Sequence, residues 1–510
     1  MSYSRCLNLK EIDSENFDVL VIGKGLAGLS AAYASAKQGK ETALFSAHAI
    51  EESSSYKAKG GISLVLGKTD SDELHVKDTL ATGKGLCKEE IVRFVVSQAS
   101  ERLNEFIDLG LEFDLDDQGE LDLGLEGGHC RKRVLHINGD NTGKGLVEFL
   151  IKLCRENNVH FFDKHGLVQF ASEKKRLTGA LFMQTNDFRF VHSNATVLAT
   201  GGYAALFEHT SNSPFSLGEG ISVSKKAGAV LEDLEFVQFH PTTMLEKHEH
   251  LLVTESVRGE KGIIVDKEGN KIVDELATRD EVSRAVYNSV LNGKNVFIDV
   301  RHLGKIFLNK RFPSFYSDLN KIGINPVEEL VPIVPAAHYT IGGVKIDASA
   351  RTSLQGLFAA GEVSCSGLHG ANRLPCNSLL EAIVMGYTAG KNASQEKAVE
   401  KSDKLNLSSE QQSRSSLSAE QGLKKIRELM WENCGIVRTG KALEKAVSEI
   451  KEFSIENSEE FSLERLRFEN TKNLAELVLE SAFAREESRG VHYRNDFPKE
   501  NVKFMKHTIV

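Results

Sequence analysis

Short apolar runs separated by helix-forming stretches fill the N-terminal part of the chain. Residues 17–22 (FDVLVI) form an apolar, largely β-branched run, the pattern of a strand buried on both faces of a parallel sheet. A stretch rich in alanine follows at 29–40, and a second apolar run follows at 41–45. This order of strand, helix and strand predicts a parallel sheet covered by helices, which is an α/β fold.

The C-terminal part has a different pattern. A polar, serine-rich stretch covers about 396–420, and residues 424–447 and 473–498 after it carry apolar positions at helical spacing. We therefore predict amphipathic helices in both segments. Because a chain of 510 residues is too long for one hydrophobic core, two or three domains are expected.

A glycine-rich turn between the first predicted strand and helix has the G-x-G-x-x-G spacing of a nucleotide-binding loop. It reads Gly23, Lys24, Gly25, Leu26, Ala27, Gly28. Such glycines permit a tight turn, a close approach to pyrophosphate, and packing of helix on strand. The acidic residue usually found about 20 positions on is missing, because the second apolar run ends in Ser46 and Ala47. The loop alone leaves NAD and FAD open.

Charge and cysteine content exclude several classes of protein. The formal charge of −9 argues against a nucleic-acid partner, and an anionic substrate must be attracted by local cations. The 7 cysteines form no CxxC pair, and the first sixteen residues are polar, so we expect a reduced, cytoplasmic protein without a secretory segment. The sequence has no apolar run of about 18 residues, the length that would predict a membrane span.

Three further segments favour FAD. Residues 54–62 (SSYKAKGGI) resemble the flavin-contacting loop of the succinate dehydrogenase and fumarate reductase flavoproteins. Residues 196–202 (TVLATGG) and 357–364 (LFAAGEVS) resemble strand-to-turn segments of FAD domains of the glutathione-reductase type. Beyond the glycine loop, the resemblance implies cofactor contacts from Ser46, Ser54, Ser55, Lys59, Gly60, Gly61, Glu219, Glu362, Ser378 and Leu379.

The resemblance extends over nearly the whole chain. Its segments are FVQFHPTTM (236–244), LLVTESVRGEKG (251–262), ELATRDEVSRAV (275–286), VPAAHYTIGG (334–343) and GEVSCSGLHGANRLPCNSLLEA (361–382). Their order is similar to that of the succinate dehydrogenase, fumarate reductase and L-aspartate oxidase superfamily. The implied architecture is a Rossmann-like FAD-binding domain (1–227 and 340–395), an inserted α+β capping domain (228–339) and a C-terminal helical domain (420–510).

The superfamily acts on small dicarboxylates, whose two charges need charge-assisted partners in a dry cleft. By resemblance, these partners are His240, Thr254, His338 and Arg373, and Arg373 is suited to a bidentate clamp. The match also makes Arg279 the proton-transfer residue. That role is unusual, because guanidinium groups stay protonated in nearly all proteins.

Two positions favour the amine-oxidising branch. Respiratory members bind FAD covalently through a histidine where this chain has Ser54, so we expect non-covalent FAD. Residues 125–136 (LEGGHCRKRVLH) resemble a segment whose glutamate, here Glu126, orients the α-ammonium group of aspartate. The implied reaction oxidises L-aspartate to iminoaspartate, with fumarate or O2 reoxidising FAD. It is the first step towards quinolinate and NAD, and quinolinate synthase is a candidate partner.

Several departures and alternatives stay open. Lys59 replaces a glutamine and points either at the flavin or outward, while Cys130 and Arg131 replace the commoner Ser-His. The segment after His136 is one residue longer than usual. The RxESRG stretch at 485–490 is interpreted as salt-bridge structure. Rival functions are a soluble fumarate reductase, the flavoprotein subunit of a membrane-docked respiratory complex, and an inactive flavin-binding relative.

Overall fold

A central sheet organises the nucleotide-binding part of the molecule. The computed structural model describes residues 3–66, 69–173, 175–246, 249–398, 404–409, 415–456 and 461–510. The sheet has seven strands in the order β6-β3-β2-β9-β8-β7, with β18 also paired to β9. Its parallel strands are β6 (His160–Asp163), β3 (Thr42–Ser46), β2 (Asp13–Ile22), β9 (Asp187–Leu198) and β18 (Leu357–Ala359), and β8 (Arg176–Gln184) and β7 (Gly166–Glu173) are antiparallel. The predicted α/β fold is confirmed, but the sheet is mixed, because β8 and β7 are antiparallel.

Helix α1 (Leu26–Lys37) follows the glycine loop and packs between α10 (Asn377–Ala393) and α4 (Thr142–Glu156). The approach of α1 to α10 is very close. A Cβ on Gly386 of α10 would lie 2.4 Å from the carbonyl oxygen of Ala27 in α1. Glycine is therefore required on α10 to let the two helices meet beside the sheet.

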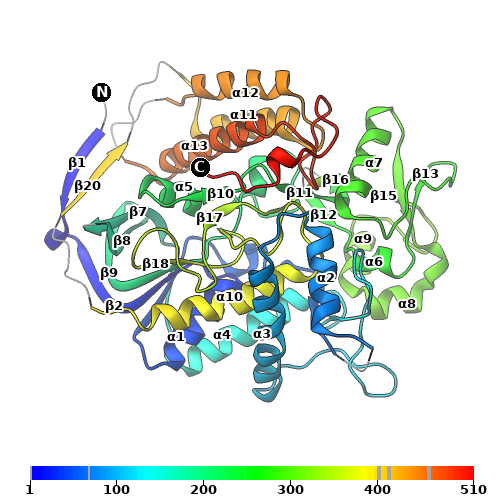
Figure 1. Cartoon of the computed structure of the whole chain (residues 1–510), viewed down its shortest axis with the longest axis horizontal. Coiled ribbons are helices and arrows are strands. Elements are labelled where there is room, and N and C mark those ends of the chain that lie inside the picture. Colours follow the sequence, from blue (N-terminus) through cyan, green and yellow to red (C-terminus); the bar gives the residue numbers. More distant parts are fainter. Residues whose placement is uncertain are drawn as a thin grey trace.

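The segment between β10 (Leu231–Glu232) and β17 (Gly343–Lys345) folds around a hydrophobic cluster of its own, which runs from Met244 to Ile333. Its helices and sheets lie at the right of Figure 1, beyond the central sheet. They are β11 (Val237–Glu246), β12 (Glu249–Leu252), β16 (Val334–Thr340), β13 (Ile263–Asp266), β14 (Val296–Asp299), β15 (Val331–Pro332), α6 (Ser256–Gly259), α7 (Arg279–Leu291), α8 (Gly304–Arg311) and α9 (Pro313–Lys321).

Three C-terminal helices pack on one another across the top of Figure 1: α11 (Ala419–Cys434), α12 (Gly440–Glu452) and α13 (Leu463–Ala484). The helices predicted in 424–447 are confirmed, but the break between them was not predicted: α11 ends before Gly435, and the Thr439 side chain caps a new helix. The helix predicted over 473–498 begins earlier and ends at Ala484. Residues 485–498 are not helical, and two of their arginines form buried ion pairs.

Those ion pairs confirm the structural interpretation of the RxESRG stretch. Arg485 pairs with Glu235 and Glu487, and Arg489 pairs with the same Glu487, all with side chains at most 4% exposed. The serine-rich stretch also holds a strand that was not predicted. This is β20 (Lys404–Ser409), which pairs with β1 (Tyr3–Asn8) at the left of Figure 1.

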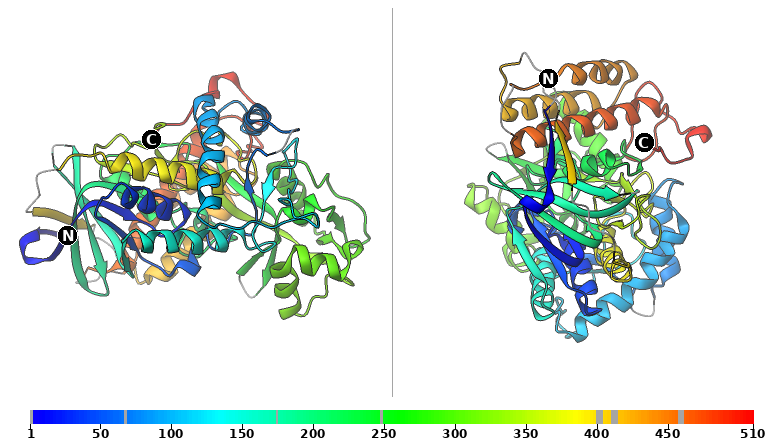
Figure 2. Two further views of the ribbon diagram at one scale, coloured as in Figure 1. Left: turned by 90° about the horizontal axis from the view of Figure 1, so that it is seen from below. Right: turned by 90° about the vertical axis from the view of Figure 1, so that its left-hand side faces the viewer.

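The remaining elements are short or cover the outside of the molecule, as the two further views in Figure 2 show. They are α2 (Asp72–Thr82), α3 (Glu89–Asp108), α5 (Glu219–Lys226), β4 (Ile62–Ser63), β5 (Val134–Leu135), β10 (Leu231–Glu232), β17 (Gly343–Lys345) and β19 (Ser364–Cys365). Among the described residues, no helix is long and apolar enough to cross a membrane.

Candidate active site

A cavity runs past the glycine loop and the carboxyl ends of β2 and β3. It reaches the segment between β10 and β17, from which Leu252 and His338 line it. Most residues predicted to contact the cofactor line it. They are Gly23, Lys24, Gly25, Leu26, Ala27, Ser46, Ser54, Ser55, Glu219, Glu362, Ser378 and Leu379. Four predicted contacts do not line the cavity, and the surroundings of each are described below: Gly28, Lys59, Gly60 and Gly61.

The glycines of the loop are set by close backbone approach. Gly23 has φ +112°, and a Cβ there would lie 2.1 Å from the carbonyl oxygen of Ala199. A Cβ on Gly28 would lie 1.9 Å from the carbonyl oxygen of Gly23, so Gly28 serves packing inside the loop. The backbone N–H of Leu26 donates to Ser55 Oγ at 3.0 Å. These features fit a loop that receives the pyrophosphate of a dinucleotide.

An acidic side chain does stand at the end of β3, although it comes from another strand. Ser46 Oγ donates to a carboxylate oxygen of Asp163 at 2.9 Å, and Lys24 forms an ion pair with the same carboxylate. Asp163 ends β6, which pairs with β3. Sequence spacing could not reveal it, because 117 residues separate it from Ser46.

Lys59 faces away from the cavity. Its Nζ forms an ion pair of 2.8 Å with Asp318 on α9. A Cβ on Gly61 would lie 2.4 Å from the carbonyl oxygen of Leu135, whereas Gly60 has open space around it. Of the two orientations considered for Lys59, the structure has the outward one, and Asp318 neutralises its charge.

Two buried arginines form the cationic centre of the site. Arg279 Nη1 and Arg373 Nε both donate to Gln238 Oε1, at 3.0 and 3.1 Å. Arg279 Nε is paired with Glu255, and Arg373 Nη1 donates to Ser378 Oγ. Among the residues that the structure describes, no acceptor binds Nη2 of either arginine. Arg373 lines the cavity, so its Nη2 is available for an anionic ligand there, whereas Arg279 does not line the cavity.

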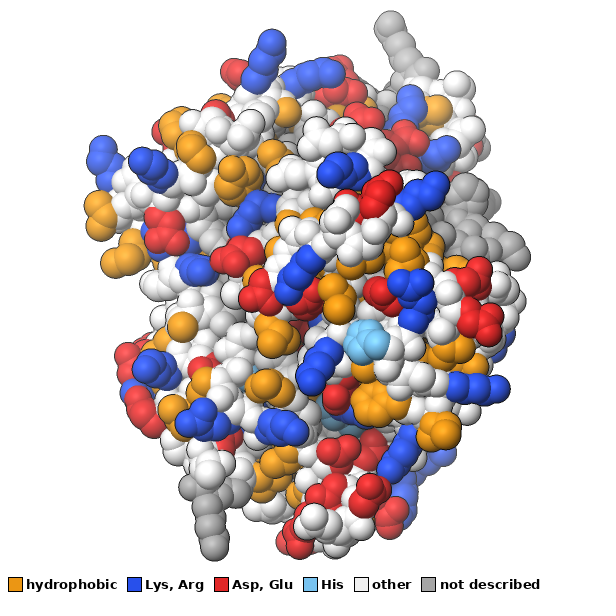
Figure 3. Space-filling view, turned by 90° about the vertical axis from the view of Figure 1, so that its right-hand side faces the viewer, with side chains coloured by type: hydrophobic (Ala, Val, Ile, Leu, Met, Phe, Trp, Pro, Cys, Tyr) orange, Lys and Arg blue, Asp and Glu red, His pale blue; other side chains and the backbone are white. Residues whose placement is uncertain are grey.

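The face of the molecule shown in Figure 3 supplies no comparable field. On the side of the molecule that carries α7 and α8, cationic and anionic side chains intermingle (Figure 3). Burial and the neighbouring Arg279 lower the pKa of Arg373 to about 10, which still leaves it charged at neutral pH. Attraction of an anion therefore depends on the two buried guanidinium groups, as the charge of the sequence implied.

The two predicted histidines lie together. The rings of His240 and His338 are 4.9 Å apart between centroids, and His338 Nδ1 lies 2.7 Å from Ser211 Oγ. Burial, and then Arg279, hold the pKa of both histidines well below the usual range, so both rings are neutral near pH 7. His338 and Arg373 line the cavity; Thr254, 1% exposed, does not.

Glu126 is buried, with 2% of its surface exposed, and does not line the cavity. Its carboxylate accepts hydrogen bonds from Ser256 Oγ at 2.6 Å and from Cys376 Sγ at 3.0 Å. Burial, followed by the nearby Glu255, raises the pKa of Glu126. Glu126 is thus an interior carboxylate close to the arginine centre, and the alternative of a solvated surface side chain is excluded.

Several polar residues of the site were not singled out from the sequence. They are Ser211, Gln238, Glu255, Arg258, Tyr339 and Cys376. Glu255 pairs with both Arg258 and Arg279. Burial alone would raise its pKa, but these two arginines hold it below the usual value. Five of the six, all but Ser211, lie inside the quoted motifs beside predicted residues, which is the signal that could have found them.

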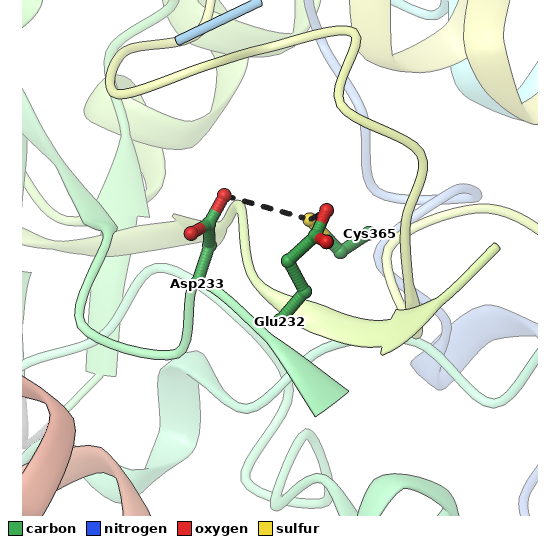
Figure 4. Close-up of side chains that lie close together, drawn as sticks. All are labelled: Glu232, Asp233 and Cys365. Carbon is green, nitrogen blue, oxygen red and sulfur yellow. Dashed lines mark hydrogen bonds between the residues drawn. The ribbon is translucent and has the colours of Figure 1, made fainter. Parts of the chain in front are cut away.

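A separate group of possible metal ligands lies outside the cavity (Figure 4). Glu232, Asp233 and Cys365 approach one another, with Cys365 Sγ 3.6 Å from Glu232 and 3.9 Å from Asp233. Lys88 pairs with Glu232 at 2.5 Å, and His507 Nδ1 lies 2.6 Å from Asp233. Burial raises the pKa of Cys365 well above that of a free thiol. The carboxylates already have protein partners, so the group is explained by packing.

Fold and cavity together define a flavoprotein that binds FAD. The FAD binding domain family matches residues 18–379, and the family described as fumarate reductase flavoprotein C-term matches 423–510. An L-aspartate oxidase of Pyrococcus furiosus is 36% identical over 96% of this chain and 98% of its own length. That of Vibrio cholerae is 36% identical, over 94% and 96%. A quinol fumarate reductase from E. coli has a TM-score of 0.89 at 28% identity, over 98% of this chain and 94% of that one. The chain belongs to the L-aspartate oxidase family of these flavoproteins.

Proposed function

We propose that the protein oxidises L-aspartate to iminoaspartate with FAD, as the first step towards quinolinate and NAD. The family supports this reaction, and relatives named L-aspartate oxidase cover nearly the whole chain. The observation that carries the proposal is the buried Glu126 carboxylate, which lies within the electrostatic reach of Arg279, together with the free Nη2 group of Arg373. An amino dicarboxylate presents the matching charges, two negative and one positive.

The glycine loop, Ser46, Glu219, Glu362 and Ser378 would hold FAD, since they line the cavity. FAD supplies the hydride acceptor when it is bound. Ser54 cannot form the covalent link that a histidine makes, so the FAD is proposed to be non-covalent.

Arg373 is proposed to bind a substrate carboxylate through Nη2. His240, His338 and Thr254 would complete the set as neutral hydrogen-bonding partners, because a neutral imidazole can both donate and accept. In this division of roles, the guanidinium group orients the substrate, and the histidines determine the shape of the site around it. Held in one orientation, the substrate keeps its reacting carbon at a fixed place in the cavity.

Proton transfer is assigned to Arg279. Its Nε already contacts Glu255, which also pairs with Arg258, so a proton given up by Arg279 can be replaced through this chain of buried charges. In the direction of amine oxidation, uptake of a proton from the ammonium group is assigned to Glu126. Burial raises its pKa, which makes its carboxylate a stronger base for that proton.

We further propose the domain division predicted above, with an FAD domain of the glutathione-reductase type. The separate hydrophobic cluster between Met244 and Ile333 supports an inserted capping domain. Since Arg279 and His338 belong to that insert and Arg373 does not, closure of the cap would complete the site. Fumarate or O2 as electron acceptor, transfer of the product to quinolinate synthase, and a cytoplasmic location belong to the same proposal.

Glu126→Gln tests the assignment of the amine. The variant should raise KM for L-aspartate by about 100-fold, as expected when a buried charge loses its partner, while fumarate reduction stays near the wild-type rate. A soluble fumarate reductase is the second candidate, favoured by the structural similarity to quinol fumarate reductase. Equal loss of both activities, or loss of neither, would favour that candidate.

A further inference from the structure

The aromatic ring of Tyr339 lies beneath the carboxylate clamp. The guanidinium carbon of Arg373 is 4.2 Å from the ring centroid, and both residues line the cavity. Gln238 and Ser378 hold Arg373 by hydrogen bonds at Nε and Nη1, in the plane of the guanidinium group. The Tyr339 ring supports one face of that plane. Tyr339 therefore contributes to where the free Nη2 group points.

A buried carboxylate stands behind this ring. The Tyr339 hydroxyl donates to Glu381 Oε2 at 3.2 Å, and His369 Nε2 lies 3.0 Å from the same oxygen. Ser366 Oγ donates to the other oxygen. Glu381 belongs to α10, is 2% exposed and does not line the cavity.

The donors around Glu381 keep it ionised. Burial alone would raise its pKa, but His369, Ser366 and Tyr339 hold that pKa below the usual value. A fixed anion that accepts a hydrogen bond from the phenol hydroxyl increases the electron density of the ring. The face of such a ring attracts a cation more strongly. Because the pair is buried, water screens this attraction little.

We propose that Glu381 is a positioning residue for carboxylate binding: it holds Tyr339 and, through that ring, fixes the orientation and charge environment of Arg373. The inference rests on the proposed function only in that Arg373 binds a carboxylate, a feature that the rival fumarate reductase shares. Glu381 itself does not line the cavity, so it contacts neither the FAD nor the dicarboxylate proposed to bind there. The hydrogen bond from the Tyr339 hydroxyl is the contact that links Glu381 to the clamp.

A double-mutant cycle on the FAD-loaded protein tests this path. The probe is malonate, a dicarboxylate without the two-carbon unit that the flavin could oxidise, and its Kd is read from the flavin absorbance. Glu381→Gln and Tyr339→Phe should each weaken malonate about three- to tenfold, in line with a cation–π contact. The double variant should be no weaker than the more affected single one. Independent effects that multiply would overturn the proposal.

Charge and shape are separated by further variants. Glu381→Asp keeps the anion and should bind malonate more tightly than Glu381→Gln; equal losses would overturn the role of charge. Glu487→Gln is the matched control, since Glu487 is equally buried but paired within the C-terminal ion pairs. It should leave malonate affinity unchanged, and a similar loss there would contradict the proposal. Flavin content of each variant reports folding.

The two proposals fail separately. Wild-type protein that binds malonate but is not reduced by L-aspartate would overturn the proposed function, while the double-mutant cycle would still decide the role of Glu381. Protein that is reduced by L-aspartate but shows multiplying effects in the cycle would overturn the role of Glu381 alone.

Discussion

At the scale of single residues, the site depends on buried charges that are only partly neutralised. Gln238 accepts a hydrogen bond from both Arg279 and Arg373, so one neutral side chain keeps two cations in a fixed relation. Glu255 balances the first of them. The excess positive charge is retained in a dry environment, where its interaction with a dianion is strong.

Arg279→Leu should lower fumarate reduction by about 10²- to 10⁴-fold, because the reacting carbon loses its proton donor. Malonate binding should change little, since Arg373 and the histidines remain. The measurements are turnover with a reduced dye and malonate titration. Arg284→Leu is the control, because Arg284 lies on the same helix but pairs with Asp280. Weak binding together with retained turnover would reduce Arg279 to a simple clamp.

Glu362 predicts a pH dependence. Burial raises its pKa from 4.5 to about 7, so between these values the folded state holds a proton that the unfolded state has released. Its contribution to stability is full below about pH 4.5 and is lost as pH rises through about 7, by up to about 3 kcal/mol. In flavin-free protein, Glu362→Gln should therefore gain stability relative to wild type as pH rises from 5 to 8. A difference that stays constant in urea unfolding would contradict this.

At the scale of elements, the cavity depends on how closely α10 approaches α1. Gly386 and Gly390 both face carbonyl oxygens of α1, where a Cβ would lie 2.4 and 2.0 Å away. The helix–helix contact therefore fixes the N-terminal turn of α1. That turn carries Leu26 and Ala27, which line the cavity.

Gly386→Ala should destabilise the protein by about 1–3 kcal/mol, because the added methyl group must displace backbone. It should also lower the FAD content after purification, since α1 shifts with its loop. Denaturant unfolding and the flavin absorbance measure the two effects. Thr388→Ala, a half-buried change on the same helix, should affect neither. Normal stability and full FAD content in Gly386→Ala would show that the close approach of α10 to α1 does not determine the position of the glycine loop.

At the scale of the whole molecule, the sequence predicted the parts whose signal is local. The glycine loop, the first two strands and most cavity-lining residues follow from short motifs, because backbone conformation there demands particular residues. Contacts across the chain were not predictable. Asp163 reaches Ser46, and Glu381 reaches Tyr339, only through sheet order and helix packing. The break before α12 was missed because apolar spacing continues across it.

The most direct test of the account is anaerobic addition of L-aspartate to the FAD-loaded protein, with succinate as the comparison. The account predicts that L-aspartate bleaches the oxidised flavin absorbance and that succinate does so far more slowly or not at all. Bleaching by succinate with no response to L-aspartate would contradict the assignment of Glu126 to an ammonium group, and with it the proposed function.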